Sequence, residues 1–262
     1  MRRYLGVDLH RNCFVVCSIE EGGRSYLRRW KLKELGGFVS ELRSTDEIAV
    51  EVTGNTRLFY DAVVGRVRRV VVVNPSEFKV ISQLVNKTDD NDAQRLAFFL
   101  WKGLLPEVRM KDKAHAQLAS VAQTRDKLVK LRTALKNKIN NIASAHGINL
   151  KKEELSSEKG LEKVLGMRFE PLVKLEVEVL VNQIRSLNKS ICELDKAIKD
   201  EGSKLKGHKN LKSIKGIGDL GAGILLSVIG DVNDFANEGK LASYFGIVPR
   251  VSNSNETQRS GR

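Results

Sequence analysis

Four acidic side chains stand where they could hold a divalent metal ion. Asp8 ends a short apolar run, Glu51 lies within a second run, and Asp89 and Asp92 are three residues apart, a spacing that puts both on one face of a helix. A carboxylate in a buried strand is costly unless it is paired, hydrogen-bonded or bound to a metal. Mg²⁺ takes oxygen ligands and, bound in pairs, stabilises the attacking and leaving oxygens of a phosphodiester. The pattern therefore indicates phosphodiester chemistry.

Each of these residues also has a simpler interpretation. Asp89, Asp90 and Asp92 could cap a helix and offset its dipole, and Asp90 is the one that we assign to this role. Glu51 could face solvent at the rim of a sheet, and Asp8 could be a loop residue. Packing is the favoured interpretation for the four scattered histidines, which are His10, His115, His146 and His208.

Alternating strands and helices over residues 1–106 would position the acids. The predicted strands are Tyr4–Asp8, Phe14–Glu20, Ser25–Trp30, Glu47–Val52 and Val70–Val73, and the predicted helices are Leu32–Arg43, Thr56–Val67, Ser76–Val85 and Asn91–Lys102. Three hairpin-linked strands followed by helix, strand, helix, strand and helix match an α/β ribonuclease-H-like layout with a mixed sheet. A flavodoxin-like sheet is the competing interpretation, but the Leu9–Asn12 link is too short for the helix that it needs.

Residues 114–205 have the spacing of two long helices. A first apolar series is interrupted by Arg125 and Arg132, whereas a second alternates steps of four and three without a break. The second series comprises Val173, Val177, Leu180, Ile184, Leu187, Ile191, Leu194 and Ile198. This stripe is typical of a coiled coil. The two helices, joined by a connector rich in Lys, Glu and Ser, could form an antiparallel hairpin, dimerise, or do both.

A third segment follows from residue 208. The Gly216-Ile217-Gly218 turn precedes a predicted helix at Leu220–Ile229, and such a turn can offer backbone N–H groups to a phosphate. A second helix is predicted at Glu238–Phe245, and the chain then ends in a polar tail, Ser252–Arg262.

The composition favours a polyanionic partner inside a cell. The 262 residues carry 45 Lys and Arg against 32 Asp and Glu, a formal net charge of +13. This excess suits nucleic acid first and an acidic membrane surface second. No apolar run is long enough for a membrane span or a signal peptide. The odd cysteine number, with Cys13, Cys17 and Cys192, indicates free thiols in a reducing cytoplasm.

Several strings resemble one known family. Tyr4-Leu-Gly-Val-Asp8-Leu-His10, Glu51-Val-Thr-Gly54, Lys87-Thr-Asp89-x-x-Asp92-Ala93 and the late Gly246-Ile-Val-Pro249 resemble the DEDD transposases of the IS110 insertion-sequence group. The likeness extends over essentially the whole chain.

The resemblance implies a division of labour along the chain. It implies a Holliday-junction-resolvase-like catalytic domain over residues 1–112, an antiparallel coiled coil with its connector over 113–206 and a C-terminal transposase domain over 207–262. Asp8, Glu51, Asp89 and Asp92 would bind Mg²⁺. The family's nucleophilic serine falls five residues after the proline, which favours Ser254, with Ser252 and Ser260 as alternatives. The family continues past a Gly-Arg pair where this sequence ends at Arg262, which predicts a truncated copy or a fragment.

The expected function is that of a DNA transposase or recombinase. It would exchange strands at element ends and target DNA as a homo-oligomer, a dimer or tetramer, and some relatives use a structured guide RNA. A hydrolytic Holliday-junction-type nuclease with the same metal site is one alternative. An inactive, truncated nucleic-acid-binding remnant is the other.

Overall fold

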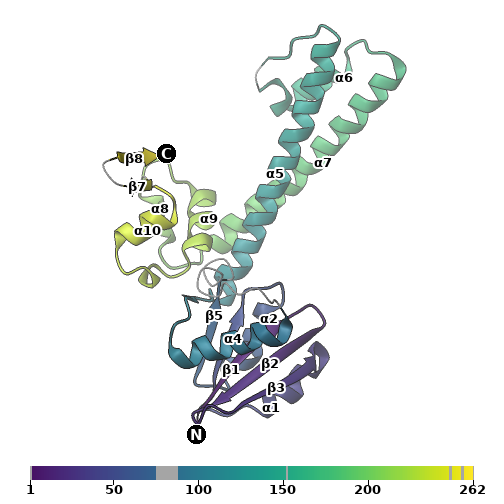
Figure 1. Cartoon of the computed structure of the whole chain (residues 1–262). Coiled ribbons are helices and arrows are strands. Elements are labelled where there is room, and N and C mark those ends of the chain that lie inside the picture. The colour runs from purple at the N-terminus through teal and green to yellow at the C-terminus, as the bar shows by residue number, and fades with distance from the viewer. Residues whose placement is uncertain (1, 75–87, 152, 248–249, 255–256, 262) are drawn as a thin grey trace. The chain divides into compact units, whose positions relative to one another are not determined.

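The chain divides into two compact units, Met1–Met110 and Lys111–Arg262 (Figure 1). The computed structural model describes residues 2–74, 88–151, 153–247, 250–254 and 257–261, with side chains described as far as Ile247. The predicted helix Ser76–Val85 lies outside the described residues.

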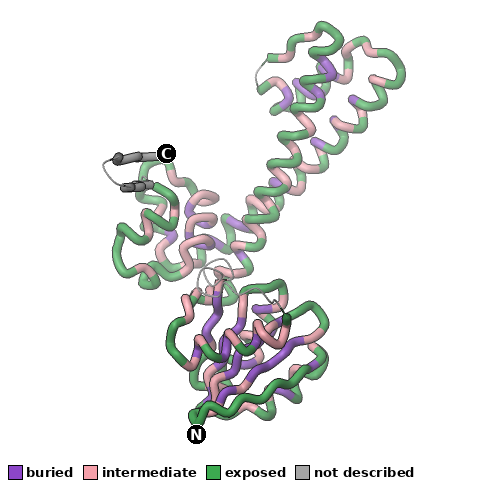
Figure 2. Tube along the Cα trace, viewed as in Figure 1, coloured by how far each residue is buried: buried purple, intermediate pink, exposed green. Residues whose placement is uncertain are grey.

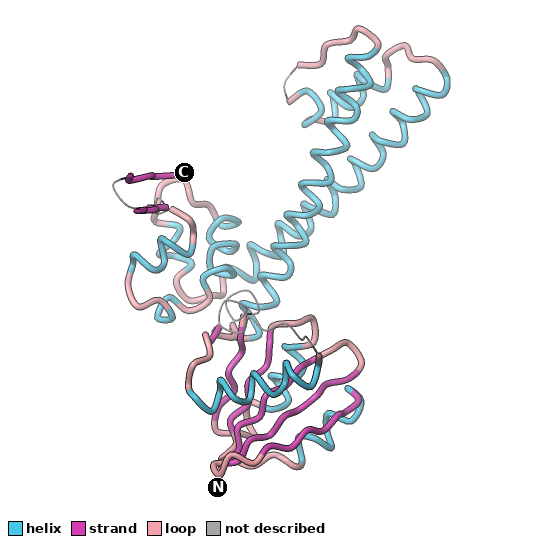
Figure 3. The backbone as a smooth tube through the Cα atoms, in the orientation of Figure 1, coloured by secondary structure: helices cyan, strands magenta, loops and turns pink. Residues whose placement is uncertain are grey.

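The first unit is built on a six-stranded mixed sheet in the order β3-β2-β1-β4-β5-β6. Figure 3 shows the strands in magenta and the helices in cyan. Its strands are β1 (Arg3–Leu9), β2 (Cys13–Glu20), β3 (Ser25–Lys31), β4 (Glu47–Glu51), β5 (Arg69–Val73) and β6 (Glu107–Val108). The first three form an antiparallel meander, β4 lies parallel to both β1 and β5, and β6 is antiparallel to β5. The meander excludes the flavodoxin-like alternative, and the two-residue strand β6 was not predicted.

Helices cover both faces of this sheet. A 3₁₀ turn (Leu32–Glu34) leads into α1 (Leu35–Ser40), followed by α2 (Thr56–Val63) and α4 (Asp89–Lys102). Phe38 of α1 and Phe59 of α2 pack against Phe14 on one face, whereas Leu96 and Leu100 of α4 pack on the other. The sheet core between the layers is buried (Figure 2). The α1 and α2 helices end earlier than their periodicity predicted.

Helix α4 touches the sheet through its backbone. Gly6 of β1 faces α4, and a Cβ atom placed there would lie 2.2 Å from the Ala93 carbonyl oxygen and 2.2 Å from the Ala97 nitrogen. Neighbouring Leu5 and Val7 belong to the core on the opposite face. Because side chains alternate along a strand, Asp8 points to the same face as Gly6, under α4.

Two long antiparallel helices dominate the second unit. As residue numbers rise along α5 (Lys113–Ala145), those of its partners on α7 (Pro171–Gly202) fall: Arg125 Nε donates to Asp195 Oδ1 at 2.8 Å, and Arg132 Nη1 to Asn188 Oδ1 at 2.9 Å. The predicted apolar series on α7 is confirmed, because its members Val177, Ile184, Ile191 and Ile198 are all buried. The two arginines that interrupt the first series face polar partners on α7.

The connector between the helices is itself folded. It contains a 3₁₀ turn (Glu154–Ser156) and α6 (Glu158–Leu165). Leu155, Leu161 and Val164 join the buried cluster of Ile139 and Ile142 on α5. A segment whose composition is typical of a loop therefore closes one end of the helix pair.

The remaining elements of the second unit are short. They are α8 (His208–Lys212), α9 (Asp219–Ile229), a 3₁₀ turn (Val232–Asp234), α10 (Glu238–Tyr244), β7 (Arg250–Ser254) and β8 (Thr257–Gly261). Both predicted helices are confirmed as α9 and α10. The expected polar tail instead forms the antiparallel pair β7–β8. Among the described residues, no helix is long and apolar enough to cross a bilayer.

Candidate functional site

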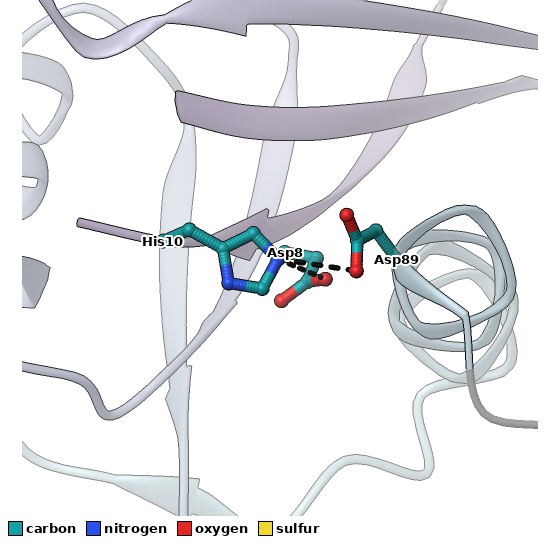
Figure 4. Close-up of side chains that lie close together, drawn as sticks. All are labelled: Asp8, His10 and Asp89. Carbon is teal, nitrogen blue, oxygen red and sulfur yellow. Dashed lines mark ion pairs between the residues drawn. The ribbon is translucent and has the colours of Figure 1, made fainter. Parts of the chain in front are cut away.

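Two of the four predicted acids meet where β1 ends and α4 begins. The His10 ring contacts both of them, with Nε2 3.1 Å from Asp8 Oδ2 and 3.3 Å from Asp89 Oδ1 (Figure 4). One ligand atom from each of Asp8, His10 and Asp89 lies within 4.8 Å of the others. Residues 81 positions apart in the sequence thus share one small site.

The local sequence explains why α4 begins beside Asp8. Thr88 caps the helix, since its side chain accepts a hydrogen bond from the Asn91 backbone N–H at 3.2 Å, and three aspartates occupy the first turn. Acidic residues are favoured there by the helix dipole. Asp90 was expected to cap the helix and offset its dipole. It lies in the first turn, where it offsets the dipole, but Thr88 is the cap, and Asp90 also accepts a hydrogen bond from Arg29 Nη2 at 2.7 Å. The backbone contact at Gly6 then holds the first turn of α4 over the end of β1.

Asp92 contributes charge to the site from the same first turn of α4 as Asp89. Its Oδ1 lies 3.4 Å from Arg95 Nη1, and it is not a member of the close group of three. Burial is the main cause that raises the pKa of Asp8, and the charges of Asp89 and Asp92 raise it further, while His10 lowers it. With its side chain only 15% exposed, Asp8 is the member of the site that most needs a positive partner.

Glu51 stands on the strand next to Asp8. β1 and β4 are parallel and pair Val7 with Val50, so the next position along each strand is Asp8 on one and Glu51 on the other. Ala49 packs against α4, and Glu51, two residues on, therefore points to the same face. The Glu51 backbone carbonyl accepts a hydrogen bond from Thr56 Oγ1 at 2.8 Å. Glu51 is a neighbour of the group of three rather than a member of it.

His10 is the residue that reasoning from the sequence missed. It was expected to be a surface or core packing residue, and that expectation did not include the two ion pairs that its exposed ring makes with carboxylates. The backbone around it is fixed by Asn55, whose Nδ2 donates to the carbonyls of His10 at 2.9 Å and Arg11 at 3.1 Å. Its place two residues after Asp8 was the available signal, since a strand end turns residues i and i+2 toward one face.

The donor set fits a divalent cation. Carboxylate oxygens suit hard cations such as Mg²⁺, and a histidine nitrogen is a common metal ligand. The side chains of Asp89 and His10 are 42% and 45% exposed, so one side of the group is open to solvent. Arg29 is the nearby cation on β3, with Nη1 3.6 Å from Asp89 Oδ2. Arg29 is mostly exposed, and among the described residues no lysine or arginine forms an ion pair with Asp8.

The predicted serine belongs to the other unit. Ser254 ends β7, where its backbone pairs with Thr257. Its side chain, like those of the alternatives Ser252 and Ser260, lies outside the described residues. The metal-site acids are thus placed by the first unit alone.

Comparison with known families assigns the chain. A family profile described as "Transposase" (DEDD_Tnp_IS110) matches residues 5–146, more than half of the sequence. The chain belongs to the IS110 family of transposases. A second profile, described as "Transposase IS116/IS110/IS902 family", matches residues 208–262. The first match spans Asp8, Glu51, Asp89 and Asp92, and membership confirms the prediction of a DNA transposase.

Relatives of this IS110-family chain align along almost its entire length. It is 25% identical over 256 residues to the "Transposase for insertion sequence element IS1111A" of Coxiella burnetii, an alignment that covers 96% of this chain and 70% of the relative. It is 23% identical over 262 residues to the "Probable family 20 transposase" of Pseudomonas aeruginosa, covering 98% of this chain and 77% of the relative.

Proposed function

We propose that this IS110-family transposase cuts and rejoins DNA strands at a Mg²⁺ site held by Asp8, Glu51, Asp89 and Asp92, with Ser254 as nucleophile. The observation that carries the proposal is the meeting of Asp8 with Asp89 across β1 and α4. Glu51 lies on β4 beside Asp8, and Asp92 lies in the same first turn of α4 as Asp89. When bound, Mg²⁺ polarises the phosphodiester and stabilises charge on the attacking and leaving oxygens.

The protein side chains divide the work of holding and placing. Asp8, the most buried of the acids in the close group, would anchor the cation, because its ionised form gains most from a positive charge. Asp89 would be a second ligand of the cation, from α4. Glu51 on β4 and Asp92 on α4 would supply the remaining carboxylates. The solvent-open side leaves room for phosphate oxygens.

Strand exchange would then need two transesterifications. In the first, Ser254 Oγ forms a bond to phosphorus as the bond from phosphorus to one deoxyribose oxygen breaks, and the serine proton ends on that oxygen. In the second, a deoxyribose hydroxyl of another strand attacks the same phosphorus, the bond from phosphorus to Ser254 Oγ breaks, and the proton of that hydroxyl ends on Oγ. The covalent intermediate splits strand exchange into two easier steps and keeps the number of phosphoester bonds constant.

The architecture supports this assignment at a finer level. The order β3-β2-β1-β4-β5, with acids on β1, β4 and the closing helix α4, favours a ribonuclease-H-like domain related to Holliday-junction resolvases. The buried four-and-three series on α7 favours a coiled coil with α5. The three-part division at 1–112, 113–206 and 207–262 stays a prediction, which limited proteolysis at the two boundaries would test.

Partners follow from the charge. A net charge of +13 suits DNA, and a guide RNA would suit the lysines that recur along α5, which are Lys127, Lys130, Lys136 and Lys138. Competition between duplex DNA and structured RNA in a binding titration at several salt concentrations would separate the two. We also propose that the chain forms a homo-oligomer, which light scattering of the full chain would measure. The proposed location is the cytoplasm.

The test compares three single variants of the full chain in a strand-exchange assay. Asp8→Asn and Ser254→Ala should each abolish exchange while DNA binding is retained. Asp90→Asn is the matched control, because Asp90 lies in the same turn of α4 but bonds Arg29, and it should retain most exchange. Wild-type exchange by the Asp8 and Ser254 variants would refute the proposal.

The hydrolytic alternative predicts no covalent intermediate, whereas the transposase proposal requires one. Denaturing electrophoresis of wild-type protein with labelled DNA should trap a covalent adduct that Ser254→Ala lacks. Metal-dependent cutting without any adduct, in protein that retains its Asp8 requirement, would favour the nuclease instead.

A further inference from the structure

We infer that His10 is a protein ligand of the divalent ion and that its imidazole gives the site a preference for Mn²⁺ over Mg²⁺. The inference rests on the proposed function, because it concerns the ion gripped by Asp8 and Asp89. It goes beyond that function by adding a nitrogen donor to a site of carboxylates.

The position of the ring is the first argument. His10 Nε2 approaches both Asp8 Oδ2 and Asp89 Oδ1, at 3.1 and 3.3 Å. The His10 ring therefore needs only a small shift for Nε2 to bind a cation that is held by those two oxygens. Neither Glu51 nor Asp92 belongs to the group whose ligand atoms are this close.

The backbone of His10 is held independently of the acids. Its N–H donates to the Cys13 carbonyl at 2.9 Å in the turn between β1 and β2, and its carbonyl accepts from Asn55 Nδ2. Asn55 comes from the segment that follows β4 and directly precedes α2. These two hydrogen bonds fix the backbone position from which the His10 ring reaches both carboxylates.

The donor type sets the selectivity. Mg²⁺ prefers oxygen ligands and gives up its waters reluctantly, whereas transition-metal ions accept imidazole nitrogen readily. An all-carboxylate site would bind Mg²⁺ and Mn²⁺ through the same contacts. With His10 in the ligand set, part of the affinity for Mn²⁺ depends on a nitrogen that contributes little to Mg²⁺.

The test measures metal binding by the full chain without DNA. Mn²⁺ is titrated and its free concentration is followed by electron paramagnetic resonance; Mg²⁺ affinity is obtained by competition, and pulsed measurements detect histidine ¹⁴N coupled to bound Mn²⁺. Wild-type protein should show this coupling. His10→Ala should lose it and bind Mn²⁺ at least about tenfold more weakly, while Mg²⁺ affinity changes by less than about threefold.

Two further variants keep the result interpretable. His10→Gln, which offers an amide in place of the ring, should also lose the ¹⁴N signal while preserving more of the local packing. His146→Gln, in the other unit, should leave both the coupling and the affinity unchanged. The thermal unfolding temperature of each variant is measured in parallel so that misfolding is recognised.

Three outcomes would overturn the inference. Persistent coupling in His10→Ala would do so, as would equal weakening of Mn²⁺ and Mg²⁺. A third outcome is that Asp8→Asn abolishes Mn²⁺ binding while the wild-type protein never shows histidine coupling. That result would retain the carboxylate site and exclude His10 as a ligand. Equal Mn²⁺ binding by wild-type and Asp8→Asn would instead overturn the proposed metal site and this inference together.

Discussion

The sheet unit and the helix pair handle polar residues in opposite ways. In the sheet unit, the acids lie at the ends of strands and in the first turn of α4. Next to them the backbone of α4 contacts Gly6 so closely that no side chain would fit there. In the helix pair, Arg125 and Arg132 lie within the apolar seam itself and bond Asp195 and Asn188. One unit positions its functional groups by close packing, and the other accommodates polar groups inside its packing.

This difference teaches where each unit is sensitive. The first depends on one non-repeating contact, so a single methyl group can displace α4 and the site with it. The second spreads its stability over a repeated series of buried residues. Its Arg125–Asp195 pair is about one-quarter exposed, and pairs of that kind contribute little. Four predictions test this contrast.

The largest effect is expected from Gly6→Ala. The new Cβ would overlap the backbone of α4 at Ala93 and Ala97, and we expect a loss of about 3 kcal/mol in the free energy of unfolding. Urea denaturation measures it, and Mn²⁺ affinity should fall as well because Asp89 moves with α4. Gly54→Ala is the control, since a Cβ there meets no atom within 4 Å. Similar stability for both variants would contradict the idea that the sheet unit depends on the close contact at Gly6.

A comparable loss is expected from Ile184→Ala in the helix pair. Ile184 is fully buried in the cluster between α5 and α7, so removing its side chain leaves a cavity and costs about 3 kcal/mol. Thermal unfolding of the full chain measures the change. Leu172→Ala, at the exposed start of the same helix, should change stability by less than about 0.5 kcal/mol. Metal binding should survive Ile184→Ala, in contrast to Gly6→Ala.

A smaller effect is expected when the seam loses an ion pair. Replacing Arg125 and Asp195 together by leucine should leave stability unchanged or raise it by about 1 kcal/mol, because an apolar pair replaces partly buried charges. Asp195→Leu alone should destabilise, since Arg125 then lacks its partner. A double-mutant cycle in urea gives both values, and a large loss in the double variant would show that the seam is as intolerant as the Gly6 contact.

The smallest effect is the pH dependence of Asp8→Asn in chelator-treated protein. Burial and the charges of Asp89 and Asp92 raise the pKa of Asp8 in the folded chain, so the unfolded chain releases this proton first. Folding is therefore penalised as pH rises through the unfolded and then the folded pKa of Asp8. The variant should be more stable than wild type at pH 7, by less than about 1 kcal/mol, and this gain should shrink near pH 4. A gain of equal size at both pH values would contradict the raised pKa.

Local pattern predicted much of the fold. The five strands that were expected are all present, because alternation and β-branched runs are short-range signals. Half of the α7 series is buried and the other half is partly buried, as its spacing required. The misses were elements that depend on distant partners, such as β6, which exists only through its pairing with β5, and α6, whose apolar residues pack on α5.

The sequence by itself determined which acidic residues could bind a metal ion, to which family the chain belongs, and which residues of α7 face its partner helix. Each of these depends on residue types at fixed short separations along the chain. Only the tertiary structure decided that Asp8 and Asp89 share a site and that His10 contacts both carboxylates. It also decided that Asp90 accepts a hydrogen bond from Arg29 and does not cap α4. These outcomes depend on how closely the backbone of α4 approaches Gly6 and on the bonds of Asn55 to the turn after β1. Both join residues far apart along the chain, and no periodicity of the intervening sequence specifies a contact of that kind.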